Sequence, residues 1–221
     1  MLDAARVRVW DAPVRIVHWL VALAMPALWW TAETGQLEWH RRLGYAVLGL
    51  IVFRLIWGFV GGSTARFSSF VRGPRAVIAY ARKLVRGEPL AMVGHNPMGG
   101  WSVIALLALV LAETRLGLFS VDVDGLESGP LSRLVDFDQG RVAAHWHHWL
   151  FNALLVLIGL HLAAIAFYAL AKRDNLVRPM LTGARAGSGS AQPMIAAPAW
   201  RALVAAARSA AFAVWVARGL R

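Results

Sequence analysis

Four long apolar stretches constrain the fold of this chain more than any other feature. They run over residues 14–32, 43–60, 98–119 and 145–171, and each is close to the roughly 20 residues that a helix needs to cross a hydrocarbon core about 30 Å thick. Every stretch also holds ionisable residues, which inside a span usually face the interior of a bundle. They include Arg15, His18, Arg54, Glu113, His147 and His161. The sequence therefore predicts an all-α integral membrane four-helix bundle.

The composition agrees with this class. Hydrophobic residues make up 58% of the 221 positions and charged residues 16%, and the eleven Trp suit a chain with anchors at the membrane interface. The formal charge of +11 is accounted for by basic loops that meet anionic lipid headgroups, so no nucleic-acid partner is expected. The absence of Cys excludes disulfides, cysteine-ligated iron–sulfur clusters and covalently attached haem.

The distribution of Lys and Arg predicts the orientation. Basic residues gather before the first stretch, between the second and third, and after the fourth. The connection between the third and fourth stretches is acidic instead. Its acids are Asp122, Asp124, Glu127, Asp136 and Asp138. By the positive-inside rule, both termini and the second connection lie on the cytoplasmic side.

Three segments are expected along the chain: a four-span domain, a flexible linker and a C-terminal helix. They cover residues 1–182, 183–198 and 199–221. The last is apolar but contains Arg201 and Arg208, and burying either in a fifth span costs a few kcal/mol. An amphipathic surface helix is therefore favoured there, with a fifth span as the alternative. Residues 74–86 predict a further amphipathic helix on the cytoplasmic leaflet.

Histidines form two sets at matched depths. His147 and His161 are fourteen residues apart, which on a helix brings their imidazoles within roughly 40° of each other and about 21 Å apart along the axis. With the predicted topology, His18 and His161 lie towards the cytoplasm, and His40 and His147 lie towards the outer face. Neutral imidazole is a common axial ligand of haem iron. The two pairs therefore indicate two bis-histidine haem sites within helices one, two and four.

Neighbouring residues refine this hypothesis. On a helix, His145 points about 160° and His148 about 100° away from His147, so His147 is the preferred ligand and His148 the alternative. Gly44, one turn from His40, and Gly159, close to His161, remove side chains where a porphyrin edge would approach.

Seven short motifs spread over residues 7–185 carry a resemblance to a known family. They are the segments 10–19, 40–45, 54–61, 66–74, 94–97, 147–161 and 175–177. In these segments the chain resembles the bacterial cytochrome b561 family, especially the branch related to the b-type cytochrome subunit of nickel-iron hydrogenases. Only the C-terminal extension departs from the usual pattern.

The resemblance implies a four-span electron carrier of the bacterial inner membrane with two haem b groups. Family members commonly exchange electrons between the quinone pool and a c-type cytochrome or a dehydrogenase, so lipid, quinone and such a protein, including a hydrogenase subunit, are the implied partners. The implied axial ligands are His18, His40, His147 and His161, in agreement with the depth argument. His95, in the motif Gly94–Pro97, is expected to bond a haem propionate or to have a structural role.

Other functions stay open at this point. A catalytic quinone or superoxide oxidoreductase needs a substrate pocket that the sequence does not locate. A membrane-anchor subunit of a larger redox complex would bind one haem or none. A transporter normally shows polar-lined paths or inverted repeats, and neither is recognisable in this sequence.

Overall fold

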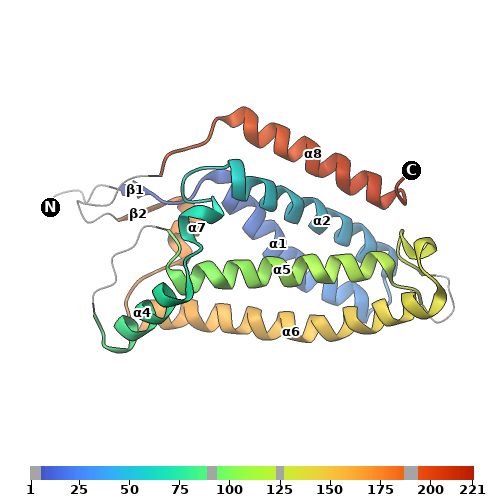
Figure 1. The fold of residues 1–221 in the computed structure, drawn as a ribbon, viewed down its shortest axis with the longest axis horizontal. Coiled ribbons are helices and arrows are strands. Elements are labelled where there is room, and N and C mark those ends of the chain that lie inside the picture. Colours follow the sequence, from blue (N-terminus) through green and yellow to red (C-terminus); the bar gives the residue numbers. More distant parts are fainter. Residues whose placement is uncertain (1–5, 89–93, 123–126, 187–193) are drawn as a thin grey trace. The chain divides into compact units, whose positions relative to one another are not determined.

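The computed structural model describes residues 6–88, 94–122, 127–186 and 194–221 (Figure 1). It confirms the all-α membrane class. Among the described residues, five helices are long and apolar enough to cross a membrane. They are α1 (Ala12–Glu33), α2 (Leu37–Val60), α5 (Pro97–Phe119), α6 (Phe137–Leu170) and α8 (Ala199–Ala217).

Short elements connect these helices. They are β1 (Arg6–Arg8), α3 (Phe67–Phe70), α4 (Pro74–Val85), the 3-10 helix η1 (Ser132–Leu134), α7 (Val177–Thr182) and β2 (Ala184–Ala186). Strands β1 and β2 pair antiparallel. Strand β2 therefore lies at the beginning of the predicted linker. Gly183, with φ +81°, ends α7, and its carbonyl accepts hydrogen bonds from the backbone N–H groups of Val9 and Trp10. Residues 187–193 of that linker lie outside the described residues.

Helices α2 and α6 begin well before their apolar stretches, and a polar side chain caps α6. The Asp136 carboxylate accepts a hydrogen bond from Gln139 N at 2.7 Å at the start of α6. At the start of α5, Asn96 Oδ1 accepts one from Gly99 N at 2.7 Å, and Pro97 is the first helical residue. The earlier start of α2 places His40 inside that helix.

The chain divides into two compact units, and each long helix contributes residues to both. The first unit comprises Met1–Ile16, Leu55–Ala105 and Gly159–Ala202. The second comprises Val17–Arg54, Leu106–Ile158 and Leu203–Arg221. The first unit therefore contains both strands, α3, α4 and α7, and the second contains most of α1 and α2.

In the first unit, Trp57 anchors the segment that precedes α1. Its side chain is only 2% exposed, and its Nε1 donates a hydrogen bond to Asp11 Oδ2 at 2.9 Å. The other carboxylate oxygen of Asp11 accepts from Val14 N at 3.0 Å and caps α1. One acidic side chain thus joins the start of α1 to the end of α2.

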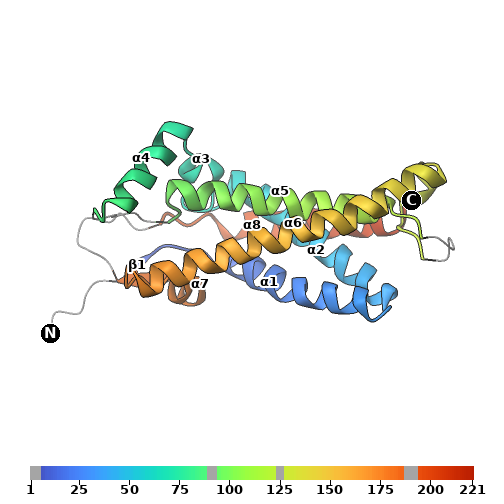
Figure 2. The same ribbon diagram turned by 90° about the horizontal axis from the view of Figure 1, so that it is seen from below.

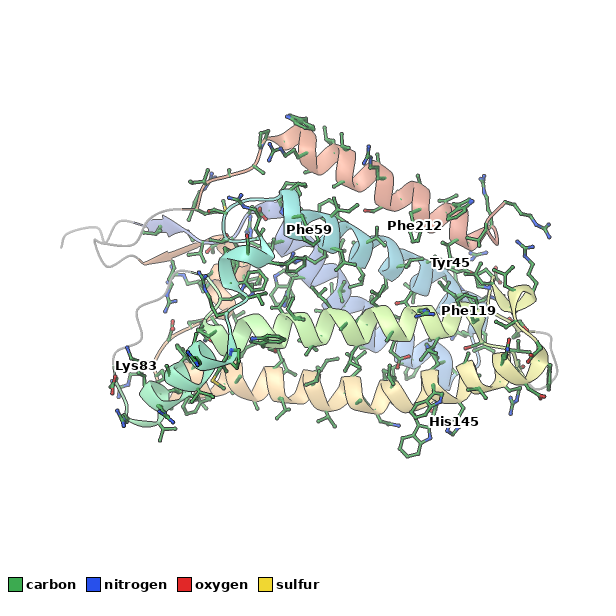
Figure 3. The ribbon with its side chains drawn as sticks, viewed as in Figure 1. Tyr45, Phe59, Lys83, Phe119, His145 and Phe212 are labelled. Atoms are coloured by element: carbon green, nitrogen blue, oxygen red, sulfur yellow. The ribbon has the colours of Figure 1, made fainter. Side chains whose placement is uncertain are left out.

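Helix α4 in the same unit has the amphipathic character that the sequence predicts. It begins at Pro74 and its inward residue is Tyr80, whose hydroxyl lies 2.7 Å from that of Tyr168. Burial and this hydrogen bond raise the pKa of Tyr80. Lys83, almost one turn after Tyr80, is exposed (Figure 3). The predicted contact of α4 with lipid headgroups stays a prediction.

In the second unit, α8 packs along α2 (Figures 1 and 2). Its buried residues include Ala205, Ser209 and Ala213, and a methyl group at Gly49 of α2 would lie 3.5 Å from the Ala213 Cβ. Such small residues let two helix backbones approach closely within a membrane. The contact explains why α8 has one buried face despite its arginines.

Candidate haem site

His40 on α2 and His147 on α6 face each other in the second unit. Their ring centroids are 6.0 Å apart and their planes are inclined by 89°. Since a metal–imidazole bond is about 2 Å long and the ring centre lies roughly 1 Å further back, two rings on opposite sides of one ion have centres about 6 Å apart. The spacing of these two residues therefore fits one iron atom between them.

Hydrogen bonds orient both rings. The Nδ1 of His40 lies 2.9 Å from the carbonyl oxygen of Leu28 on α1. The Nδ1 of His147 lies 2.9 Å from the carbonyl oxygen of Glu113 on α5 and 2.7 Å from its carboxylate Oε2. An Nδ1–H that donates to these backbone carbonyls leaves the Nε2 lone pair for a metal, which is the usual arrangement of metal-binding histidines.

A tight turn between α1 and α2 explains how His40 reaches Leu28. Gly35 has a φ of +68°, a left-handed conformation that glycine adopts without steric cost. Gln36 N then donates to Thr31 O at 2.8 Å, so the chain reverses direction at once. The first turn of α2 consequently returns along the last turns of α1.

Two glycines near this pair have different surroundings. A Cβ at Gly117, one turn after Glu113 on α5, would lie 3.1 Å from the Cε1 atom of His147. A Cβ at Gly44 would meet no atom within 4 Å. Gly117 thus allows close contact with the His147 ring, whereas Gly44 leaves open space beside His40. The approach of a porphyrin edge to Gly44 stays a prediction, and the open space there is compatible with it.

The neighbours of His147 on α6 point elsewhere. The side chains of His145 and His148 are exposed, whereas that of His147 is half-buried. His145 lies beside Trp149, with ring centroids 6.3 Å apart, on the outward side of the helix (Figure 3). Of His145, His147 and His148, it is thus His147 that faces His40 in the described structure.

The other two predicted ligands fall in different units. His18 is half-buried on α1 in the second unit, with its ring 5.1 Å from that of Trp19. His161 is half-buried on α6 in the first unit. The pairing of His18 with His161 therefore stays a prediction.

His95 lies between two aromatic rings in the first unit. Its ring centroid is 4.5 Å from that of Trp10 and 4.6 Å from that of Phe70. These contacts support the structural role, which is one of the two roles that the sequence suggests for this residue. They also join the segment before α1 to the start of α5.

Glu113 is the residue of this site that sequence reasoning missed. Its side chain is buried, at 7% exposed, yet the sequence marks it only as an ionisable residue in an apolar stretch. Its contact with His147 joins positions 34 residues apart in the sequence, so helical periodicity within one stretch could not reveal that contact. The available signal was the energetic cost of an acid inside a span.

A multi-pass helical protein with facing, half-buried imidazoles has the features of a membrane cytochrome. A family model described as "Prokaryotic cytochrome b561" matches residues 9–183. The chain therefore belongs to the prokaryotic cytochrome b561 family of membrane electron carriers, and this membership implies two b-type haems. The matched range ends before α8 begins.

Curated relatives agree with this family. A protein of Azotobacter chroococcum mcd 1 is 24% identical over 213 residues, which cover 81% of this chain and 88% of the relative. A protein of Rhizobium leguminosarum bv. viciae is 23% identical over 217 residues, which cover 83% and 90%. Both are named "Probable Ni/Fe-hydrogenase B-type cytochrome subunit". No solved structure matches the chain significantly.

Proposed function

We propose that this protein transfers electrons across the bacterial inner membrane through two bis-histidine b haems. His40 and His147 bind the outer haem, and His18 and His161 bind the inner one. The observation that carries the proposal is the 6.0 Å separation of the His40 and His147 rings, together with the acceptor at each Nδ1. The depth match of His18 with His161 supports the second site.

The residues of the outer site orient and shield the ligands. Bound haem iron supplies one-electron redox chemistry. The Leu28 and Glu113 acceptors fix the ring tautomers, and α2 and α6 hold both imidazoles rigidly, so that electron transfer requires little movement of the protein. The apolar residues of the spans keep water away, and such a shell sets the potential of a metal site.

The proposed partners are quinone in the membrane and a c-type cytochrome or dehydrogenase outside it. The names of the relatives make a hydrogenase-type dehydrogenase the first choice for the protein partner. In that arrangement the dehydrogenase delivers electrons to the outer haem, and the inner haem passes them towards the quinone pool.

Haem content tests the proposal. The purified full chain should give a reduced-minus-oxidised b-type spectrum and two haems per chain by pyridine haemochrome assay. Alanine at His18, His40, His147 or His161 should each remove one haem, because rigid helices leave no nearby replacement ligand. His145→Ala is the matched control on α6 and should retain both. A wild-type chain without haem, or single variants that all keep two six-coordinate haems, would overturn the assignment.

We further propose a fifth crossing by α8, with the N-terminus cytoplasmic and the C-terminus outside. The sequence alone favours a surface helix and a cytoplasmic C-terminus. Within the first unit, however, Met194 N donates to Arg8 O, and Ser63 N donates to Ile195 O at 2.9 Å. Within the second unit, Arg133 donates to the Gly219 carbonyl. The segment before α8 thus contacts the second connection, the segment after it contacts the third, and α5 separates these connections.

Cysteine labelling tests the topology, because the chain has no native Cys. Variants with a single cysteine in place of Lys83, Asp138 or Arg221 are treated, in intact cells, with a membrane-impermeant maleimide. We expect positions 138 and 221 to react and position 83 to react only after permeabilisation. Reaction at 221 only after permeabilisation would mean that α8 lies on the cytoplasmic surface.

A further inference from the structure

Glu113 presents an unusual environment for an acid. It lies in the apolar helix α5, and both oxygens of its carboxylate are buried. Within the described residues neither oxygen makes a hydrogen bond, and Oε2 lies 2.7 Å from His147 Nδ1, which is within ion-pair distance. Placing an acid within a membrane span costs free energy, and such acids usually have a functional role. The contact with His147 indicates what that role is.

We propose that Glu113 is a positioning residue whose carboxylate charge lowers the midpoint potential of the haem bound by His147. The inference rests on the proposed ligation by His40 and His147. It gives the two ligands of one iron different electronic roles: the Nδ1 of His40 meets a neutral carbonyl, whereas the Nδ1 of His147 meets both a carbonyl and a carboxylate.

The direction of the effect follows from charge. The Nδ1 of His147 hydrogen-bonds to the Glu113 carbonyl, and the carboxylate charge 2.7 Å from this nitrogen makes the other ring nitrogen more basic, and so a better donor to the metal. The ferric state carries one more positive charge than the ferrous state, and a nearby negative charge in a medium of low dielectric constant favours it. Both effects stabilise the oxidised form and lower the potential.

A purely structural role predicts a different result. The backbone carbonyl of Glu113 also accepts from His147 Nδ1, at 2.9 Å, and it remains when the side chain changes. The orientation of the His147 ring should therefore survive substitution of the side chain. Loss of the carboxylate should then change the potential while the haem stays bound.

Redox titration of Glu113→Gln and Glu113→Ala tests the inference. Both variants should retain two haems and show a higher potential for the outer haem, with at least a tenfold change in its ferric-to-ferrous equilibrium constant, or about 59 mV for one electron. The matched control is Glu38→Gln, which removes the charge of an exposed carboxylate that pairs with Arg42 on α2. The control should leave both potentials unchanged.

The outcomes separate this inference from the proposed function. Two bound haems with an unchanged outer potential in Glu113→Gln would overturn the role of the carboxylate and leave the ligand assignment intact. If neither variant folds, infrared difference spectra of the wild-type chain with isotope-labelled glutamate decide the matter. A carboxylate band that shifts when the outer haem is reduced supports the inference, and an unchanged band overturns it. Failure of the ligand assignment would appear instead as two retained haems in the His40 and His147 variants.

Discussion

The two histidine pairs of this cytochrome differ in how they are linked. His40 and His147 lie in one compact unit, and an acceptor from a neighbouring helix orients each ring. His18 and His161 belong to different units. Their proposed pairing as haem ligands rests on their predicted depth and on the family resemblance. Spacing on a helix selects candidate ligands, whereas contacts from other helices decide which rings meet.

Double variants give the largest expected effect. His40→Ala combined with His147→Ala removes both ligands of one proposed site, so one haem per chain should remain. His40→Ala combined with His161→Ala damages both sites, so no haem should remain in six-coordinate form. Pyridine haemochrome quantitation and the reduced spectrum measure the difference. Equal haem content in the two double variants, or the reverse order, would show that the pairs are wrongly matched.

The ring angle predicts a spectroscopic difference within the wild-type protein. The planes of His40 and His147 are inclined by 89°. Perpendicular axial imidazoles leave two iron d orbitals nearly equal in energy, so the outer ferric haem should give a highly anisotropic low-spin signal in electron paramagnetic resonance. His40→Ala should remove that signal and keep the signal of the inner haem. A rhombic signal from the outer haem, typical of parallel rings, would contradict this geometry.

Much of this arrangement can be predicted from the sequence, because it depends on periodicity. The apolar stretches predicted α1, α2, α5 and α6, and helical spacing selected His147 rather than His145. The role of Glu113 and the contact of α8 with α2 could not be predicted in this way. Both depend on atoms from distant segments, and small residues such as Ala213 give a weak signal in a chain already rich in apolar residues.

Glycine substitutions should have a smaller effect that is confined to one site. A methyl group at Gly117 would approach the Cε1 atom of His147 to 3.1 Å, so the ring must shift by a few tenths of an ångström. We expect Gly117→Ala to keep two haems and to move the outer haem's absorption band and potential slightly. Gly159→Ala is the matched control, since its methyl group would meet no atom within 4 Å. A shift of the outer haem in both variants would mean that the close contact is not the cause.

The smallest expected effect concerns the acidic connection between α5 and α6, near the outer site. If a basic electron carrier docks there, charge complementarity mainly speeds its encounter with the protein. Not every acid is suited to this test. Glu127 pairs with Arg41, and Asp124 lies outside the described residues. Asp136 caps α6, whereas Asp138 is exposed in its first turn.

Asp136→Asn and Asp138→Asn therefore remove charge cleanly, because Asn also caps a helix. We expect each to slow electron exchange with a basic carrier by about twofold at low salt, and the difference to vanish near 1 M salt, where charges are screened beyond roughly 3 Å. Stopped-flow oxidation of the reduced protein measures the rate. Equal rates at low salt would mean that the acids reflect membrane topology alone, since positive charge is kept on the cytoplasmic side irrespective of any partner.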